Sequence, residues 1–210
     1  MSRKSGTFPS RHEGKKPLSN AQAVTKVVQE TLSVPAANEP GAPSGYQVRR
    51  LREEDWESFR DLRMEMLQDT PIAYTETYES ALDLPEAEWR FRARRGASES
   101  CCALIAFDES APTIFLATMT VFEDSSGSFQ VVGVYASPST RGSGLAKLML
   151  GRLVDWARNR GAGGQLSLLV HEKNSRAFNF YLKAGFAPSG QASPYTLDPA
   201  FCELEMVLKL

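Results

Sequence analysis

Residues 129–146 read FQVVGVYASPSTRGSGLA, and this stretch decides the fold that the sequence predicts. An apolar strand pattern ends at Ala136, a proline turns the chain, and glycines at 142 and 144 precede a helical pattern that reaches Arg160. The first N–H groups of a helix have no partner inside it, and glycine lets a ligand approach them closely. The stretch therefore predicts a site for a phosphate or pyrophosphate group.

Spacing excludes two common phosphate loops. A dinucleotide-binding fingerprint needs a third glycine where this chain has Lys147. A nucleotide P-loop needs Gly-Lys followed by Ser or Thr after four intervening residues, and the sequence contains no such run. The pattern that remains is Arg141-x-x-Gly144-x-Ala146, directly after a predicted strand.

A second motif follows the apolar run 166–170, which predicts a buried strand. Residues 174–186 read NSRAFNFYLKAGF. Together the motifs resemble those of the GCN5-related N-acetyltransferase (GNAT) superfamily, which carries Arg/Gln-x-x-Gly-x-Gly/Ala and then Asn-x-x-Ala-x-x-Phe-Tyr followed by Gly-Phe. The resemblance extends over residues 46–210, and we expect these residues to form the N-acetyltransferase domain.

The order of the predicted elements agrees with the fold that this resemblance implies. That fold, the acyl-CoA N-acyltransferase fold, is a mixed α/β (α+β) structure with a central, mostly antiparallel sheet flanked by helices. Hydrophobic periodicity predicts strands over 46–51, 101–107, 114–122, 129–136, 166–170 and 203–208. It predicts helices over 53–67, 85–95 and 145–160 and another on the second motif.

The resemblance implies acetyl-CoA as the cosubstrate. Backbone amides of the glycine turn would hold its pyrophosphate, and the Arg141 side chain would add positive charge nearby. These amides belong to Gly142, Ser143, Gly144, Leu145 and Ala146.

The pantetheine arm of the cosubstrate would lie between two strands that diverge, as the family implies. Unpaired main-chain groups would then bind it instead of a neighbouring strand. On the strand before the turn, these groups would belong to Val134, Tyr135 and Ala136. From the second motif, Asn174 would hydrogen-bond the arm, and Ala177 and Phe180 would line its channel. Asn174 also fits the N-cap of its helix.

Tyr181, in the Phe-Tyr pair of the second motif, is the predicted catalytic acid. A tyrosine hydroxyl can protonate or hydrogen-bond the CoA sulfur as it leaves. The alternative is a tyrosine that only packs at a boundary between helix and sheet.

The sequence assigns no general base. Glu123 and Asp124 are weak candidates and read equally well as solvated turn acids, and His171 reads better as a structural residue. An acetylated cysteine requires an activated thiolate, and no cysteine has a histidine or basic neighbour in sequence. We therefore expect direct transfer within a ternary complex.

The acceptor is predicted to be the primary amine of a small molecule. In this fold the segment between the first two helices helps form the acceptor pocket, and here it is residues 68–84. It contains four acids and two tyrosines, a composition that favours a cationic amine or simply a solvated loop: Asp69, Glu76, Glu79, Asp83, Tyr74 and Tyr78. A protein or peptide N-terminal acetyltransferase and a non-catalytic acyl-CoA sensor remain alternatives.

Composition adds further expectations. The 210 residues carry a formal charge of −1, which favours neither nucleic acid nor an anionic membrane as partner. Three cysteines, no metal-ligand spacing and no apolar run long enough to span a bilayer fit a metal-free cytoplasmic protein, monomeric or homodimeric. Residues 1–45 read as a flexible tail and linker, or as a docking arm through a helix at 21–32.

Overall fold

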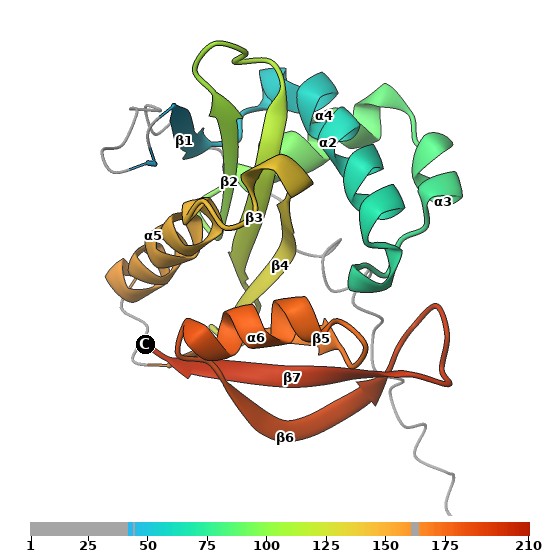
Figure 1. The fold of residues 1–210 in the computed structure, drawn as a ribbon, viewed down its shortest axis with the longest axis vertical. Helices are drawn as coiled ribbons and strands as arrows, with labels where there is room; N and C mark the ends of the chain where they lie inside the picture. The colour runs from blue at the N-terminus through green and yellow to red at the C-terminus, as the bar shows by residue number, and fades with distance from the viewer. Residues whose placement is uncertain (1–41, 44, 161–163) are drawn as a thin grey trace, which may run out of the picture.

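The backbone of the protein is organised around one seven-stranded sheet with the strand order β1-β2-β3-β4-β5-β7-β6 (Figure 1). This structure is a computed structural model, and it describes residues 42–43, 45–160 and 164–210. The predicted helix at 21–32 and almost all of the predicted tail lie outside the described residues.

Neighbouring strands are antiparallel, except that β4 and β5 are parallel. The mixed, mostly antiparallel fold is therefore confirmed. The strands are β1 (Tyr46–Arg50), β2 (Cys101–Asp108), β3 (Phe115–Glu123), β4 (Phe129–Ala136), β5 (Gln165–His171), β6 (Ala187–Pro194) and β7 (Cys202–Lys209).

Five α-helices and three short 3₁₀ turns connect the described strands, and they cover both faces of the sheet (Figure 1). The helices are α2 (Trp56–Asp69), α3 (Tyr78–Leu82), α4 (Glu86–Gly96), α5 (Leu145–Asn159) and α6 (Ser175–Lys183). The 3₁₀ turns are η1 (Glu53–Asp55), η2 (Pro71–Ala73) and η3 (Pro138–Thr140).

The sheet divides the interior into two cores because side chains alternate along each strand. The first core lies under α5 and α6 and includes Leu104 of β2, Leu153 of α5, and Leu166 and Val170 of β5. The second core lies under α2, α3 and α4 and includes Ile105 of β2. No described residue of β5, β6 or β7 belongs to the second core, so α2, α3 and α4 cover only the β1–β4 half of their face.

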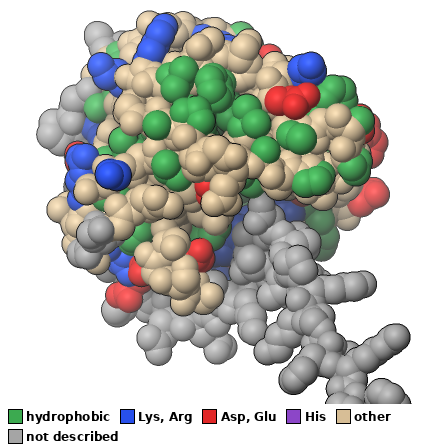
Figure 2. All heavy atoms as spheres, turned by 90° about the horizontal axis from the view of Figure 1, so that it is seen from below, with side chains coloured by type: hydrophobic (Ala, Val, Ile, Leu, Met, Phe, Trp, Pro, Cys, Tyr) green, Lys and Arg blue, Asp and Glu red, His purple; other side chains and the backbone are tan. Residues whose placement is uncertain are grey.

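The surface seen from below Figure 1 carries a gathering of apolar side chains, with charged side chains mostly around it (Figure 2). Among the large apolar residues that the structure describes, those exposed on the whole surface are Leu82, Ile114, Val132, Leu169, Leu182 and Leu197. None of the described helices has the length and apolar character needed to cross a membrane.

Leu153→Ala tests the first core. Leu153 is fully buried, so the substitution removes apolar contacts and leaves a cavity, and we expect the free energy of unfolding to fall by about 2–5 kcal/mol. Leu182→Ala is the control, because Leu182 of α6 is 42% exposed and its loss should cost little. Urea unfolding measures both, and equal losses would contradict the assignment of Leu153 to the core.

Candidate active site

The parallel strands β4 and β5 separate soon after they begin. Only Phe129 with Leu166 and Gln130 with Ser167 are paired, although β4 continues to Ala136 and β5 to His171. At about 3.3 Å per residue, residues 131–136 run for roughly 20 Å without a partner on the β5 side. Figure 1 shows β4 and the β5–β7 strands turning away from each other. This divergence is the opening that the family resemblance implies.

A bulge shapes β4 inside this opening. Its pairing with β3 passes from Val132 opposite Thr120 to Tyr135 opposite Thr118, so an extra residue is inserted on β4. Gly133 lies there with φ +59°, a conformation that other residues rarely adopt. Gly133 and Val134 are therefore not paired with β3.

The glycine turn stands at the wide end of the opening. Gly142 (φ +82°) and Gly144 (φ +90°) are left-handed, and Gly144 is the N-cap of α5. The Ser143 hydroxyl donates to the Thr140 carbonyl (2.7 Å) and accepts from the Leu145 amide (3.2 Å). The Leu145 amide is thus already engaged within the turn.

Four amides of residues 142–147, and one hydroxyl nearby, have no partner within the described part of the chain. The amides belong to Gly142, Gly144, Ala146 and Lys147, whereas the Ser143 amide donates to the Thr140 carbonyl (3.3 Å). The hydroxyl is the buried Oγ of Ser137, directly after β4, which the sequence did not mark. Free donors at this position suit the oxygen atoms of a phosphorylated ligand.

Arg141 links the turn to the C-terminal end of α2. Its Nε donates to the Ala136 carbonyl (3.0 Å), and its guanidinium forms an ion pair with Asp69. Burial alone would raise the pKa of Asp69, but hydrogen bonds from Thr70 and Arg141 lower it on balance. The positive charge of Arg141 is therefore partly neutralised by the Asp69 carboxylate.

Tyr181 lies in the first core, buried beside the rings of Phe180 (5.2 Å between centroids) and Phe186 (5.6 Å). Burial raises the pKa of its hydroxyl above the ordinary value, and the Tyr74 hydroxyl adds to the rise. Tyr181 therefore stays protonated at neutral pH and can act only as a donor of its proton. At the start of α6, Asn174 Oδ1 accepts from the Ala177 amide (3.1 Å), which confirms the predicted N-cap.

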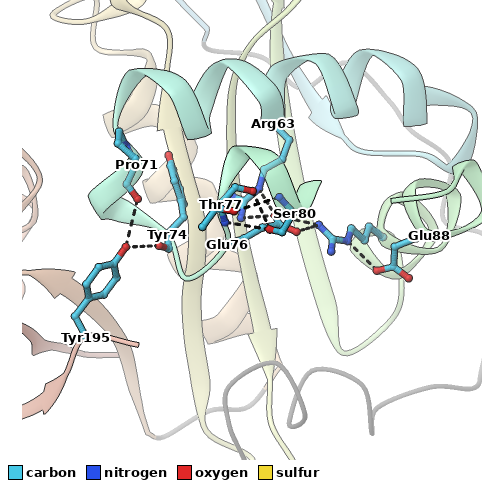
Figure 3. A network of polar contacts seen from close by, with 9 residues as sticks. Arg63, Pro71, Tyr74, Glu76, Thr77, Ser80, Glu88 and Tyr195 are labelled. Carbon is cyan, nitrogen blue, oxygen red and sulfur yellow. Dashed lines mark hydrogen bonds and ion pairs between the residues drawn. The ribbon is translucent and has the colours of Figure 1, made fainter. Parts of the chain in front are cut away.

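Tyr74 reaches the opening from the other face of the sheet. Its hydroxyl donates to the Val134 carbonyl (3.1 Å), and the Arg63 guanidinium lies 4.6 Å from its ring. Its own carbonyl accepts from the Tyr195 hydroxyl (2.7 Å), which joins the β6–β7 loop to η2 (Figure 3). From the sequence, Tyr74 could be identified only as one residue of the acidic, aromatic segment 68–84.

That acidic rim is largely neutralised in the structure. Asp69 is paired with Arg141, and Glu76 forms ion pairs with Arg63 (2.9 Å) and Arg92 (2.9 Å). Two of the four acids of the segment are thus structural, and Figure 3 shows the Glu76 network. Of the remaining two, Glu79 lies in the short helix α3 and Asp83 directly follows that helix. The sequence pattern did not predict α3.

The two carboxylates proposed as weak base candidates lie at the wrong end of the sheet. Glu123 pairs with Phe129, where β4 and β5 are still joined, and it contacts Arg160 (3.2 Å). Asp124 accepts from the amides of Ser126 (2.8 Å) and Ser128 (3.1 Å) and so holds a turn. Neither carboxylate faces the opening, and the base must be sought elsewhere.

Neither Cys101 nor Cys102 is suited to act as a nucleophile. Cys101 and Cys102 are buried, and burial raises the pKa of the Cys101 thiol to about 12. A thiol with so high a pKa is not a thiolate at neutral pH. In the ranges that the structure describes, there is also no group of three or more side chains that could hold a metal ion.

The chain matches one family model and shares its fold with solved acetyltransferases. Residues 48–186 match the family model described as the acetyltransferase (GNAT) family. A GNAT-family acetyltransferase from Streptococcus pneumoniae shares the fold with TM-score 0.65 and 17% identity, over 78% of this chain and 98% of that chain. YncA from Salmonella typhimurium, solved with its cofactor acetyl-CoA, gives TM-score 0.64 and 15% identity over 80% and 95%.

A third similar structure is a ribosomal-protein-alanine N-acetyltransferase from Brucella melitensis. It has TM-score 0.64 and 16% identity over 78% of this chain and 99% of that chain. At these identities the solved structures show a shared fold. No curated protein sequence matches the chain significantly.

Gly144→Ala tests the left-handed turn. An added Cβ meets no atom within 4 Å, so the change tests only the backbone, and we expect it to cost about 1–2 kcal/mol of stability. Gly151→Ala, inside α5 and equally free of contacts, should instead stabilise by about 0.5–1 kcal/mol. Thermal and urea unfolding measure both changes, and effects of the same sign would refute the left-handed N-cap.

Proposed function

Because the chain belongs to the GNAT family of acetyltransferases, we propose that it transfers the acetyl group of acetyl-CoA to a primary amine of a small molecule. The observation that carries the proposal is the divergence of β4 from β5, with the glycine turn at its wide end and Tyr181 beside it. The acceptor amine and acetyl-CoA would be held together, so that transfer is direct.

When bound, acetyl-CoA supplies an activated thioester carbonyl. Its pyrophosphate would meet the free amides of Ala146 and Lys147 and the positive charge of Arg141. The Ser137 hydroxyl is a further donor at the same position. Main-chain groups of Val134, Tyr135 and Ala136, which β5 leaves unpaired, would bind the pantetheine arm, although the carbonyls of Val134 and Ala136 already accept from Tyr74 and Arg141.

The second motif would complete the channel. Ala177 and Phe180 are partly buried against the first core, where they can line the arm, and Asn174 caps the helix that carries them. A main-chain N–H of the β4 bulge would stabilise the negative charge that develops on the acetyl carbonyl oxygen. Main-chain N–H groups would therefore contribute to the binding of acetyl-CoA as much as side chains do.

Tyr181 would give its proton to the sulfur as it leaves. Its raised pKa keeps that proton on the hydroxyl until the sulfur develops negative charge. The buried, high-pKa thiol of Cys101 argues against an acetylated enzyme and favours direct transfer.

Ligand-dependent stability tests the cosubstrate. A ligand that binds only the folded protein raises its stability by about 2.7 kcal/mol at a hundredfold excess over Kd. We expect acetyl-CoA and CoA to raise the melting temperature and ATP to leave it unchanged. No shift with either CoA species would overturn the proposal.

Tyr181→Phe tests the acid. We expect kcat to fall by about 10²–10⁴-fold, because the sulfur then leaves without a proton donor, while the acetyl-CoA-induced shift in melting temperature is kept. The assay follows free thiol released with 1,4-diaminobutane, kanamycin or a peptide with a free N-terminus as acceptor. Tyr46→Phe, on the edge strand β1, is the control and should keep wild-type turnover.

A Tyr181→Phe enzyme with unchanged turnover would show that this tyrosine only packs. Wild-type protein that binds acetyl-CoA and acetylates none of the three acceptors would instead support the sensor alternative. Preference for the peptide would move the proposal to an N-terminal acetyltransferase.

A further inference from the structure

A polar and aromatic cluster lies at the end of β5, on the face that α2, α3 and α4 leave uncovered. His171 ends β5 and stands directly opposite Glu203 of β7 in the antiparallel register. Directly opposed residues point to the same face, with Cβ atoms about 4.5–5.5 Å apart. The rings of Tyr195 (4.7 Å from the His171 ring) and Phe201 (5.4 Å) close the cluster.

His171 presents a donor to this cluster. Its Nδ1 accepts from the Lys173 amide (3.1 Å), so in the neutral ring the proton is on Nε2. The side chain is 4% exposed, and Nε2 is buried without a hydrogen-bond partner in the described residues. A buried N–H without a partner is costly, so this atom is suited to a ligand. Because Nε2 already carries the proton, His171 is not the base in this tautomer.

Glu203 is the hydrogen-bond acceptor and potential proton acceptor of the cluster. Its side chain is largely buried (9% exposed), but the carboxylate oxygens keep contact with solvent and form no hydrogen bond or ion pair with any residue that the structure describes. Burial raises the pKa of its carboxyl above the ordinary value. Its charge also raises the pKa of Tyr195, whose hydroxyl closes the β6–β7 loop onto η2, although burial contributes more to that rise.

The cluster is joined to the opening through Tyr195. The Tyr195 hydroxyl donates to the Tyr74 carbonyl (2.7 Å), and the Tyr74 hydroxyl donates to the Val134 carbonyl (3.1 Å). Residues 166, 168 and 170 of β5 face the first core with Tyr181, so His171 and Glu203 lie on the opposite face. Tyr181, the proposed proton donor, and Glu203 thus lie on opposite faces of the sheet.

We propose that Glu203 is the general base of the reaction and that this cluster binds the ammonium group of a cationic amine substrate. The aromatic ring of Tyr195 favours a cation, as does a carboxylate that has no ion-pair partner. The Phe201 ring already has the Lys173 ammonium 5.8 Å from its centroid. One N–H bond of the ammonium breaks, an O–H bond forms on Glu203, and the lone pair left on nitrogen becomes the nucleophile. Glu203 then returns its proton to solvent.

This inference rests on the proposed function and names the base and acceptor class that the earlier sections leave open. The acids of residues 68–84 are weaker choices, because Asp69 and Glu76 are already paired. The other titratable groups on the elements packed here are His171, Tyr195, Lys173, Glu172, Asp198, Cys202, Glu205, Lys209, Asp69 and Tyr74.

Glu203→Gln tests the base by a pH profile. With the best of the three acceptors named above, we expect kcat/KM at pH 7 to fall by about 10²–10⁴-fold. The deficit should shrink as the pH approaches the pKa of the amine, because a neutral amine needs no base. Glu57→Gln, an exposed carboxylate on α2, is the matched control. A deficit that is absent, or equal at every pH, would overturn the assignment.

A stability measurement tests the buried carboxylate without activity. Glu203 binds its proton more tightly in the folded than in the unfolded chain, so wild-type stability falls as the pH rises from the ordinary carboxyl pKa through the raised one. Glutamine does not ionise, so the Glu203→Gln protein does not lose stability in this way. The melting temperature of Glu203→Gln relative to wild type should therefore increase from pH 4 to pH 8, and a constant difference would refute a desolvated carboxylate.

The outcomes separate this inference from the function it rests on. Wild type that turns over, with a Glu203→Gln enzyme that is equally active, would refute the base and keep the transferase. Wild type that binds no acetyl-CoA would refute both.

Discussion

Backbone hydrogen bonding in β4 is the constraint on which the site depends. After Gln130 the strand loses its partner in β5, and its inward-facing main-chain groups must find other partners or a ligand. The bulge at Gly133, the Tyr74 hydroxyl on the Val134 carbonyl and Arg141 on the Ala136 carbonyl all answer that requirement. A ligand with an extended, amide-containing arm satisfies the rest, and this is why a strand that would otherwise be a defect can persist at the centre of the sheet.

Most of the fold could be predicted because its strands carry apolar periodicity and its decisive turn needs glycine at two left-handed positions. The exceptions have physical reasons. β6 reads APSGQASP and is exposed throughout, and such a strand persists only at a sheet edge, where prolines leave no donor unpaired. The helix α3 has five residues and depends on Thr77 as its cap, so it has too little periodicity to be detected.

The glycine turn, the divergent strand and Tyr181 could be named from local motifs, whereas the polar groups that face them could not. His171 and Glu203 are 32 residues apart and meet only through the antiparallel register of β5 and β7. Tyr74 meets Val134 across 60 residues. Local pattern also gave Glu123 and Asp124 a role that their position at the joined end of β4 and β5 rules out. Sequence shows which side chains have suitable chemistry, and strand pairing decides which of them meet.

The short ladder between β4 and β5 also has a mechanical consequence. Two residue pairs join the β1–β4 half of the sheet to the β5–β7 half, so rotating one half against the other breaks few backbone bonds. Resistance to that rotation comes instead from side chains: Leu145, Leu153 and Leu166 pack in a core that spans both halves, and Tyr195 hydrogen-bonds to Tyr74. The two halves of the sheet are thus held together mainly by side-chain contacts, and few backbone hydrogen bonds cross the space between them.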